Sequence, residues 1–113
     1  MDQKDFSRRI ELLINYVNAK NNKEFIMECD DRIVHGVCEL CFNILRPERE
    51  IVLNKQTLEN LKPFRRILHN LANSRLSIKN KRRLLSAISE DFVPILKRSI
   101  VPTLKKKYLS DNN

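Results

Sequence analysis

The sequence predicts an all-α protein, a compact bundle of five to six short helices, and three observations support this. The chain has 113 residues, which suits one hydrophobic core. It contains a single glycine, Gly36, whereas sheets joined by tight turns need several residues that accept positive φ. Its apolar residues recur at helical spacing. We therefore expect one helical domain over residues 1–109, with residues 110–113 as a frayed tail.

Three helices are expected in the N-terminal half. The first begins with Asp2 or Asp5 as N-cap and shows apolar spacings of four, three and four: Phe6, Ile10, Leu13 and Val17. A short helix over about 23–29 follows. Asp30 and Asp31 stand where the third helix needs an N-cap and a charge that complements the helix dipole. The helix continues to residue 45, and Pro47 closes it. Because this third helix is the most apolar, we expect it at the centre of the fold.

The fourth helix is expected after a polar connection over residues 47–57. Asn60 is a suitable N-cap, which places Pro63 in the first turn, where the missing backbone donor costs little. The apolar face of this helix includes Phe64, and its basic face lies opposite.

Two more helices are expected in the last third of the chain. A fifth helix begins at a Ser77 cap and ends near residue 88. The acidic pair 90–91 suits the N-terminus of a sixth helix, with Pro94 in its first turn. Pro102 is expected to end or kink that helix.

Positive charge is concentrated in the C-terminal half. Residues 1–60 have 9 Lys or Arg and 11 Asp or Glu, whereas residues 61–113 have 13 and 3, within a total net charge of +8. No acidic residue occurs between Leu61 and Ser89. This asymmetry indicates a polyanionic partner, which would be nucleic acid, an acidic membrane surface or an acidic protein. A basic surface that serves only solubility is the alternative.

The candidate nucleic-acid-binding residues are the cations of segment 62–83, together with a C-terminal lysine cluster. Cations fixed on helices neutralise phosphates and release counterions. No aromatic residue is available in this segment to stack on unpaired bases, with Phe64 assigned to the core, so the backbone of duplex DNA is the favoured target. The candidates are Lys62, Arg65, Arg66, Arg75, Lys79, Lys81, Arg82, Arg83, Lys105, Lys106 and Lys107.

The run of cations over residues 79–83 is also typical of a short nuclear-import signal, which suggests a nuclear location. The chain starts without a signal peptide and has three cysteines, so we expect a reducing intracellular compartment.

Metal binding and catalysis find little support. His35, Cys38 and Cys41, with Cys29 nearby, resemble half of a zinc site, but a second ligand pair from a separate element is missing. Buried free cysteines explain the pattern better. No phosphate-binding glycine loop or activated nucleophile is evident, so we expect a non-enzymatic protein without cofactor or metal.

Two other kinds of function stay open. A helical interaction module, such as a capsid-associated adaptor or a death-fold-like bundle, would use the basic face for an acidic protein, and it could form a homo-oligomer. Alternatively, the segment 92–109 combines apolar residues with cations, as interfacial membrane helices do. A helix that packs on the core explains this segment more simply, so a membrane partner is the less favoured interpretation.

Four segments in order resemble a family of small basic proteins encoded by Maverick/Polinton-type elements and their adenovirus-like relatives. They are Asp31-Arg-Ile-Val-His-Gly-Val-Cys-Glu-Leu-Cys-Phe-Asn-Ile-Leu45, Leu61-Lys-Pro-Phe-Arg-Arg-Ile-Leu-His-Asn-Leu-Ala72, Ser77-Ile-Lys-Asn-Lys-Arg-Arg-Leu-Leu85 and Phe92-Val-Pro-Ile-Leu96. The similarity spans about residues 10–100, and the order of the four segments is its most specific part.

The resemblance implies a core protein that condenses DNA, which would be located in a virus-like particle. On that analogy Lys79, Lys81, Arg82 and Arg83 would contact packaged DNA. The family commonly has paired glycines before the Phe-x-Pro segment, whereas this chain has residues 89–91, Ser-Glu-Asp. This difference favours a C-terminal segment packed on the domain over a detached, membrane-active one.

Overall fold

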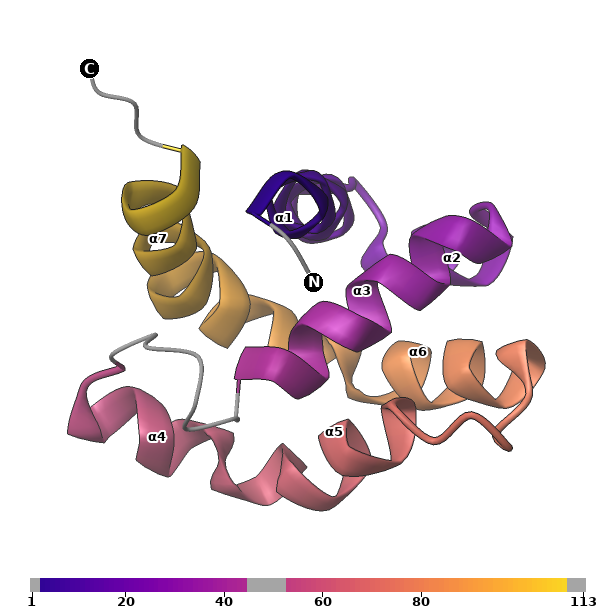
Figure 1. The fold of residues 1–113 in the computed structure, drawn as a ribbon. Helices are drawn as coiled ribbons and strands as arrows, with labels where there is room; N and C mark the ends of the chain where they lie inside the picture. The colour runs from indigo at the N-terminus through magenta and orange to yellow at the C-terminus, as the bar shows by residue number, and fades with distance from the viewer. Residues whose placement is uncertain (1–2, 45–52, 110–113) are drawn as a thin grey trace.

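The computed structural model describes residues 3–44 and 53–109, and within these ranges it contains helices and no strand (Figure 1). The predicted all-α fold is confirmed. In chain order the elements are α1 (Gln3–Asn18), α2 (Asn22–Glu28), α3 (Asp31–Ile44), α4 (Lys55–Leu61), the 3-10 turn η1 (Lys62–Phe64), α5 (Arg65–Leu71), α6 (Ile78–Ile95), the π-helix η2 (Leu96–Ile100), α7 (Val101–Leu104) and the π-helix η3 (Lys105–Leu109). The expected cap at Asp2, the stop at Pro47 and the tail 110–113 lie outside the described residues.

The first three helices form where the sequence predicts them. The four residues of the predicted apolar face of α1 are all buried. The Asn21 side chain caps α2 by accepting a hydrogen bond from the Glu24 backbone N–H at 3.1 Å. The Asn22 amide donates to the Tyr16 carbonyl at 2.7 Å and so closes the C-terminus of α1. Two adjacent asparagines therefore end one helix and begin the next.

Helix α3 lies at the centre of the fold, as its composition predicts. It packs against α1, α5 and α6, and Figure 1 shows it between these elements. Eight of its residues are buried: Val34, Gly36, Val37, Cys38, Leu40, Cys41, Asn43 and Ile44. Helices α1, α5 and α6 therefore share α3 as a packing partner, while α2 packs mainly on α6.

Helix α4 was not predicted, and the expected N-cap at Asn60 is wrong. The cap is Asn54, whose side chain accepts a hydrogen bond from the Thr57 backbone N–H at 2.8 Å. Pro63 stands in the 3-10 turn between α4 and α5. Because proline has no N–H to donate to the preceding turn, the helix tightens there and restarts as α5.

The expected fifth and sixth helices are a single helix, α6. Ser77 is its N-cap, as predicted, since the Asn80 backbone N–H donates to Ser77 Oγ at 3.2 Å. The helix continues through the acidic pair 90–91 and contains Pro94. The π-helical η2 follows directly and leads to Pro102. A wider helical turn accommodates the hydrogen bonds that proline cannot make, so Pro102 changes the helix type without ending the helix.

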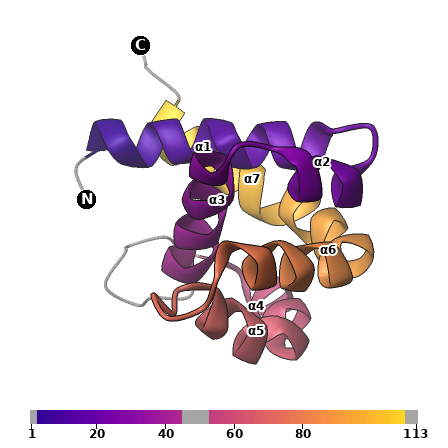
Figure 2. The ribbon, with the colours of Figure 1, turned by 90° about the vertical axis from the view of Figure 1, so that its right-hand side faces the viewer.

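The C-terminal helices pack on the core beside α1. Leu96, Ile100 and Leu104 are fully buried, and the rings of Phe6 and Tyr108 meet edge-on with centroids 4.5 Å apart. In Figures 1 and 2, α7 lies next to α1 at the end of the molecule away from α5. The apolar residues of this segment therefore serve the core. Within residues 3–44 and 53–109, no helix is both long and apolar enough to cross a bilayer.

A buried hydrogen-bonded pair connects α1 to α6. The hydroxyls of Tyr16 and Ser89 are 2.6 Å apart, and Ser89 also donates to the Leu85 carbonyl at 2.7 Å. Since the Ser89 proton is used in that bond, Tyr16 is the donor to Ser89. Burial raises the pKa of the Tyr16 phenol well above its ordinary value, so the phenol keeps the proton that this bond requires.

We predict that Ser89→Ala destabilises the protein more than Tyr16→Phe. Ser89→Ala leaves the Tyr16 hydroxyl in the core without its acceptor, which costs about 1–3 kcal/mol. Tyr16→Phe leaves Ser89 bonded to the Leu85 carbonyl, and its cost is about 1 kcal/mol. Urea denaturation measures both free energies of unfolding. The double variant should lose less than the sum of the two, and a costlier Tyr16→Phe would contradict the assignment of donor and acceptor.

Candidate nucleic-acid interface

Six of the eight cations of segment 62–83 are exposed, five of them on consecutive helical elements and one, Arg75, in the turn between α5 and α6. Helix α5 buries Leu68 and Leu71 against the core, which directs its polar residues outward. Ser77 starts α6 directly after the turn that follows α5, so α5 and the first turns of α6 lie side by side (Figures 1 and 2). We call the six exposed residues the α5–α6 basic surface: Lys62, Arg65, Arg66, Arg75, Lys79 and Arg83.

Lys81 is buried, so it is not a member of this surface. It is only 6% exposed, and it lies one helical turn before Leu85 in the row of α6 that faces the core. The positive charge of Lys81 is close enough to Cys38 to lower the pKa of that thiol, in opposition to the larger effect of burial. The predicted contact of Lys81 with nucleic acid is therefore not possible in this conformation.

Arg82 is engaged inside the protein. One guanidinium nitrogen donates to the Ile26 carbonyl at 3.0 Å, near the C-terminus of α2. The other is 2.6 Å from a carboxylate oxygen of Asp31, in the first turn of α3. The Arg82 side chain is 14% exposed. The Arg82 guanidinium therefore joins α6 to the junction of α2 and α3, and Arg82 is not part of the candidate interface.

The three C-terminal lysines lie apart from the α5–α6 basic surface. Lys105, Lys106 and Lys107 are exposed on η3, which packs against α1. In Figures 1 and 2 this end of the chain is beside α1, whereas α4 and α5 lie at the opposite end of the molecule. The sequence-predicted candidates therefore occupy two separate regions.

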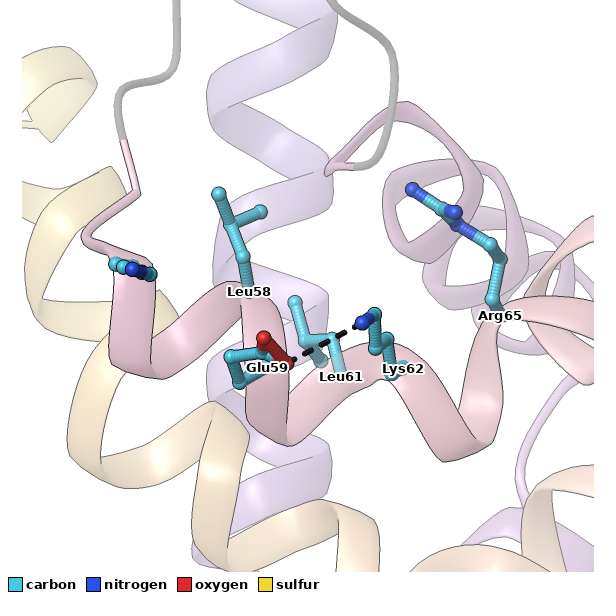
Figure 3. Close-up of a pocket in the computed structure, with 6 residues that line it drawn as sticks. Leu58, Glu59, Leu61, Lys62 and Arg65 are labelled. Carbon is cyan, nitrogen blue, oxygen red and sulfur yellow. Dashed lines mark ion pairs between the residues drawn. The ribbon is translucent and has the colours of Figure 1, made fainter.

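A cleft with cationic walls opens between α4 and α5 (Figure 3). Its volume is about 260 Å³ and its lining includes Lys55, Leu58, Lys62 and Arg65. Lys62 forms an ion pair with Glu59 at 3.4 Å, and both side chains are largely exposed to solvent. Sequence reasoning missed Lys55 because it treated the start of α4 as a connecting loop; the Asn54 capping pattern is the signal that would have identified it.

No aromatic ring is available on the α5–α6 basic surface for stacking on bases. The chain has five Phe and two Tyr, all within the described residues, and each is buried or half-buried. Phe64 packs against Phe92 with ring centroids 5.4 Å apart, as its assignment to the core predicts. The surface therefore offers charge and hydrogen-bond donors, the groups that contact phosphate.

The cysteines are free thiols in or near the core. Burial raises the pKa of Cys38 to about 12 and that of Cys41 well above its ordinary value. Cys29 is half-buried, and burial raises its pKa too, with Arg82 acting in the opposite direction. High thiol pKa values disfavour the thiolates that bind metal or act as nucleophiles. Among the described residues, no group of three or more His, Cys, Asp or Glu is arranged to hold a metal ion.

Comparison with protein families, curated proteins and solved structures finds no match.

We predict that Arg82 and Arg83, although adjacent, differ sharply in their effect on stability. Arg82→Gln removes charge-assisted hydrogen bonds at the junction of α2 and α3 and should lower the free energy of unfolding by about 2 kcal/mol. Arg83 is exposed, so Arg83→Gln should change it by less than about 0.5 kcal/mol. Urea denaturation of both variants provides the measurement. Equal effects would contradict the internal role of Arg82.

Proposed function

We propose that this protein is a non-enzymatic nucleic-acid-binding protein that contacts the phosphate backbone of duplex DNA with little sequence preference. The observation that carries the proposal is the α5–α6 basic surface, where exposed cations gather in a stretch of chain that has no acidic residue from Leu61 to Ser89. Four of its members are arginine, whose planar donor array suits phosphate oxygens.

The rigidity of this surface supports the proposal. Five of the six cations project from helical elements, and Leu68, Leu71 and Leu85 anchor the opposite sides of α5 and α6 in the core. The sixth, Arg75, lies in the short turn between α5 and α6. Ordering them on DNA therefore costs less conformational entropy than ordering a flexible tail would. Binding would be driven largely by the release of counterions from the DNA.

Duplex is the favoured form of nucleic acid. Proteins that hold single strands combine a basic groove with exposed aromatic side chains on which bases stack. Every aromatic residue of this chain is buried or half-buried, so contacts with a continuous phosphate backbone suit the surface better.

A role as a virus-like core protein is the more specific form of the proposal, and it rests on the resemblance to Maverick/Polinton-type proteins alone. A place in a virus-like particle rests on the same resemblance, whereas a nuclear location rests on the import-signal pattern of residues 79–83. The interpretation of residues 79–83 as an import signal has less support, because Lys81 is buried and Arg82 is engaged internally. In the folded protein Lys79 and Arg83 are the exposed cations of that run.

The proposal predicts a specific decrease in binding for a variant that carries four Gln substitutions, Arg65→Gln, Arg66→Gln, Lys79→Gln and Arg83→Gln. Its affinity should fall to a similar extent on duplexes of unrelated sequence, because phosphate contacts carry no sequence information. The slope of log K against log salt should become less steep by about 0.9 for each phosphate that the variant no longer neutralises. Fluorescence anisotropy titrations at several salt concentrations measure both quantities.

The matched control removes four exposed cations from other elements, with Lys20→Gln, Lys23→Gln, Lys97→Gln and Arg98→Gln. It changes the net charge by the same amount, so it should retain most of the affinity if the α5–α6 basic surface is the contact site. Equal decreases in the two variants would indicate general polyanion attraction. A wild-type protein that binds no duplex at low salt would refute the proposed function.

The cleft between α4 and α5 supports a second candidate function, the binding of an acidic protein segment. Leu58 is 48% exposed at this cleft, next to the cations Lys55, Lys62 and Arg65. Glu59 also lines the cleft and pairs with Lys62, so three cations stand against one carboxylate. An exposed apolar side chain at a cleft with this excess of positive charge suits a peptide that presents one apolar anchor among acidic residues.

This second function predicts that Leu58→Asn weakens binding of an acidic probe while leaving duplex affinity unchanged. A glutamate-rich peptide that contains one leucine serves as the probe, and a peptide of the same charge without leucine is its control. Calorimetric titration should show a several-fold preference for the leucine peptide in the wild type, and this preference should disappear in the variant. Equal affinity for the two peptides would eliminate the cleft as an anchor site.

A further inference from the structure

A second cationic region lies in the N-terminal half, although that half is acidic on average. A groove between α1 and α3, with a volume of about 410 Å³, is lined by Arg8, Arg9, Arg32 and His35. Its lining also includes one acidic residue, Glu39. Three arginines from two helices therefore line one groove. Their total positive charge exceeds the single negative charge of Glu39.

The ion pairs in and near the groove leave guanidinium donors for a ligand. Arg9 Nη1 is 3.0 Å from a Glu39 carboxylate oxygen, which orients the Arg9 guanidinium but uses only part of its five N–H donors. Arg32 is 3.7 Å from Asp30, and its side chain is 92% exposed. Arg8 is exposed as well. Arginine forks of this kind suit the oxygens of a phosphodiester.

The base of the groove depends on the close approach of α1 and α3 at Gly36. A Cβ atom at position 36 would lie 2.7 Å from Leu12 Cδ1, so only glycine lets the two helices meet at this distance without a shift of Leu12. The packed pair forms the base of the groove, and the arginines stand around it.

This groove and the α5 part of the α5–α6 basic surface lie toward opposite ends of the molecule, whereas Lys79 and Arg83 lie on α6, which is placed between the two ends. Figures 1 and 2 show α1 at one end and α4–α5 at the other, with α3 running between them. The longest extent of the protein is 38 Å. Duplex DNA resists bending over about 150 base pairs, so a short duplex that lies across α5 does not curve around the molecule to fill the groove.

We propose that the groove between α1 and α3 is a second phosphate-binding site, and that one protein molecule can therefore bridge two separate duplexes. This inference rests on the proposed function, because it assigns the first duplex to the α5–α6 basic surface. Lys105, Lys106 and Lys107 add positive charge at the same end, since η3 packs on α1 through the contact between Phe6 and Tyr108.

The test is a capture experiment with two duplexes of about 30 base pairs, far shorter than the length over which DNA bends. One is immobilised at low density, the full-length protein is bound to it, and a second fluorescent duplex is then added. The variant with Arg8→Gln and Arg32→Gln changes two exposed residues of the groove and keeps the Arg9–Glu39 pair. It should bind the immobilised duplex within about threefold of wild type and capture about tenfold less of the second duplex. Thermal unfolding confirms that the variant is folded.

The control variant, Lys20→Gln with Lys23→Gln, changes the charge equally at exposed positions outside the groove and should capture the second duplex as wild type does. Undiminished capture by the groove variant would overturn the inference, since bridging would then arise from another region or from a dimer. Wild-type protein that binds one duplex but captures no second would also overturn it, while the proposed function would stand. Failure to bind the first duplex would remove both.

Discussion

The link between Arg82 and the junction of α2 and α3 fixes the position of α6, and the distribution of surface charge depends on it. A guanidinium that donates to the Ile26 carbonyl and to the Asp31 carboxylate defines which side of α6 faces inward. Once that side is set, Lys81 must enter the core, and Lys79 and Arg83, four residues apart on the helix, must face solvent. Of the four cations in residues 79–83, one is therefore buried, one forms internal hydrogen bonds and two face solvent.

Much of the fold could be predicted from the sequence because the relevant signals are local. Helical spacing identified the core face of α1, and the position of Ser77 identified the start of α6. The missed features depend on context. Asn54 and Asn60 are equally suitable as caps by residue type, and Pro94 is accepted within α6, although proline usually ends a helix. The burial of Lys81 was visible in principle, because it lies in the same helical row as Leu85, Ile88 and Phe92.

The charge of a segment of sequence proved to be a poor guide to the charge of a surface. Residues 1–60 are slightly acidic in total, yet α1 and α3 together place three arginines around one groove. Acidic residues such as Glu24 and Glu28 lie on α2 and belong to a different part of the surface. Arg8 and Arg32 are distant in sequence, so only the packing of α1 on α3 at Gly36 brings them together.

The cysteines of α3 have a consequence for the chemical behaviour of the protein. With a pKa near 12 for Cys38 and a higher one than usual for Cys41, both sulfurs stay protonated at neutral pH, and thiols react slowly in that form. Because both sulfurs are also buried, alkylating reagents and oxidants reach them only when the centre of the fold opens. The rate at which these two sulfurs are modified therefore measures how often α3 separates from its neighbours by local opening of the core.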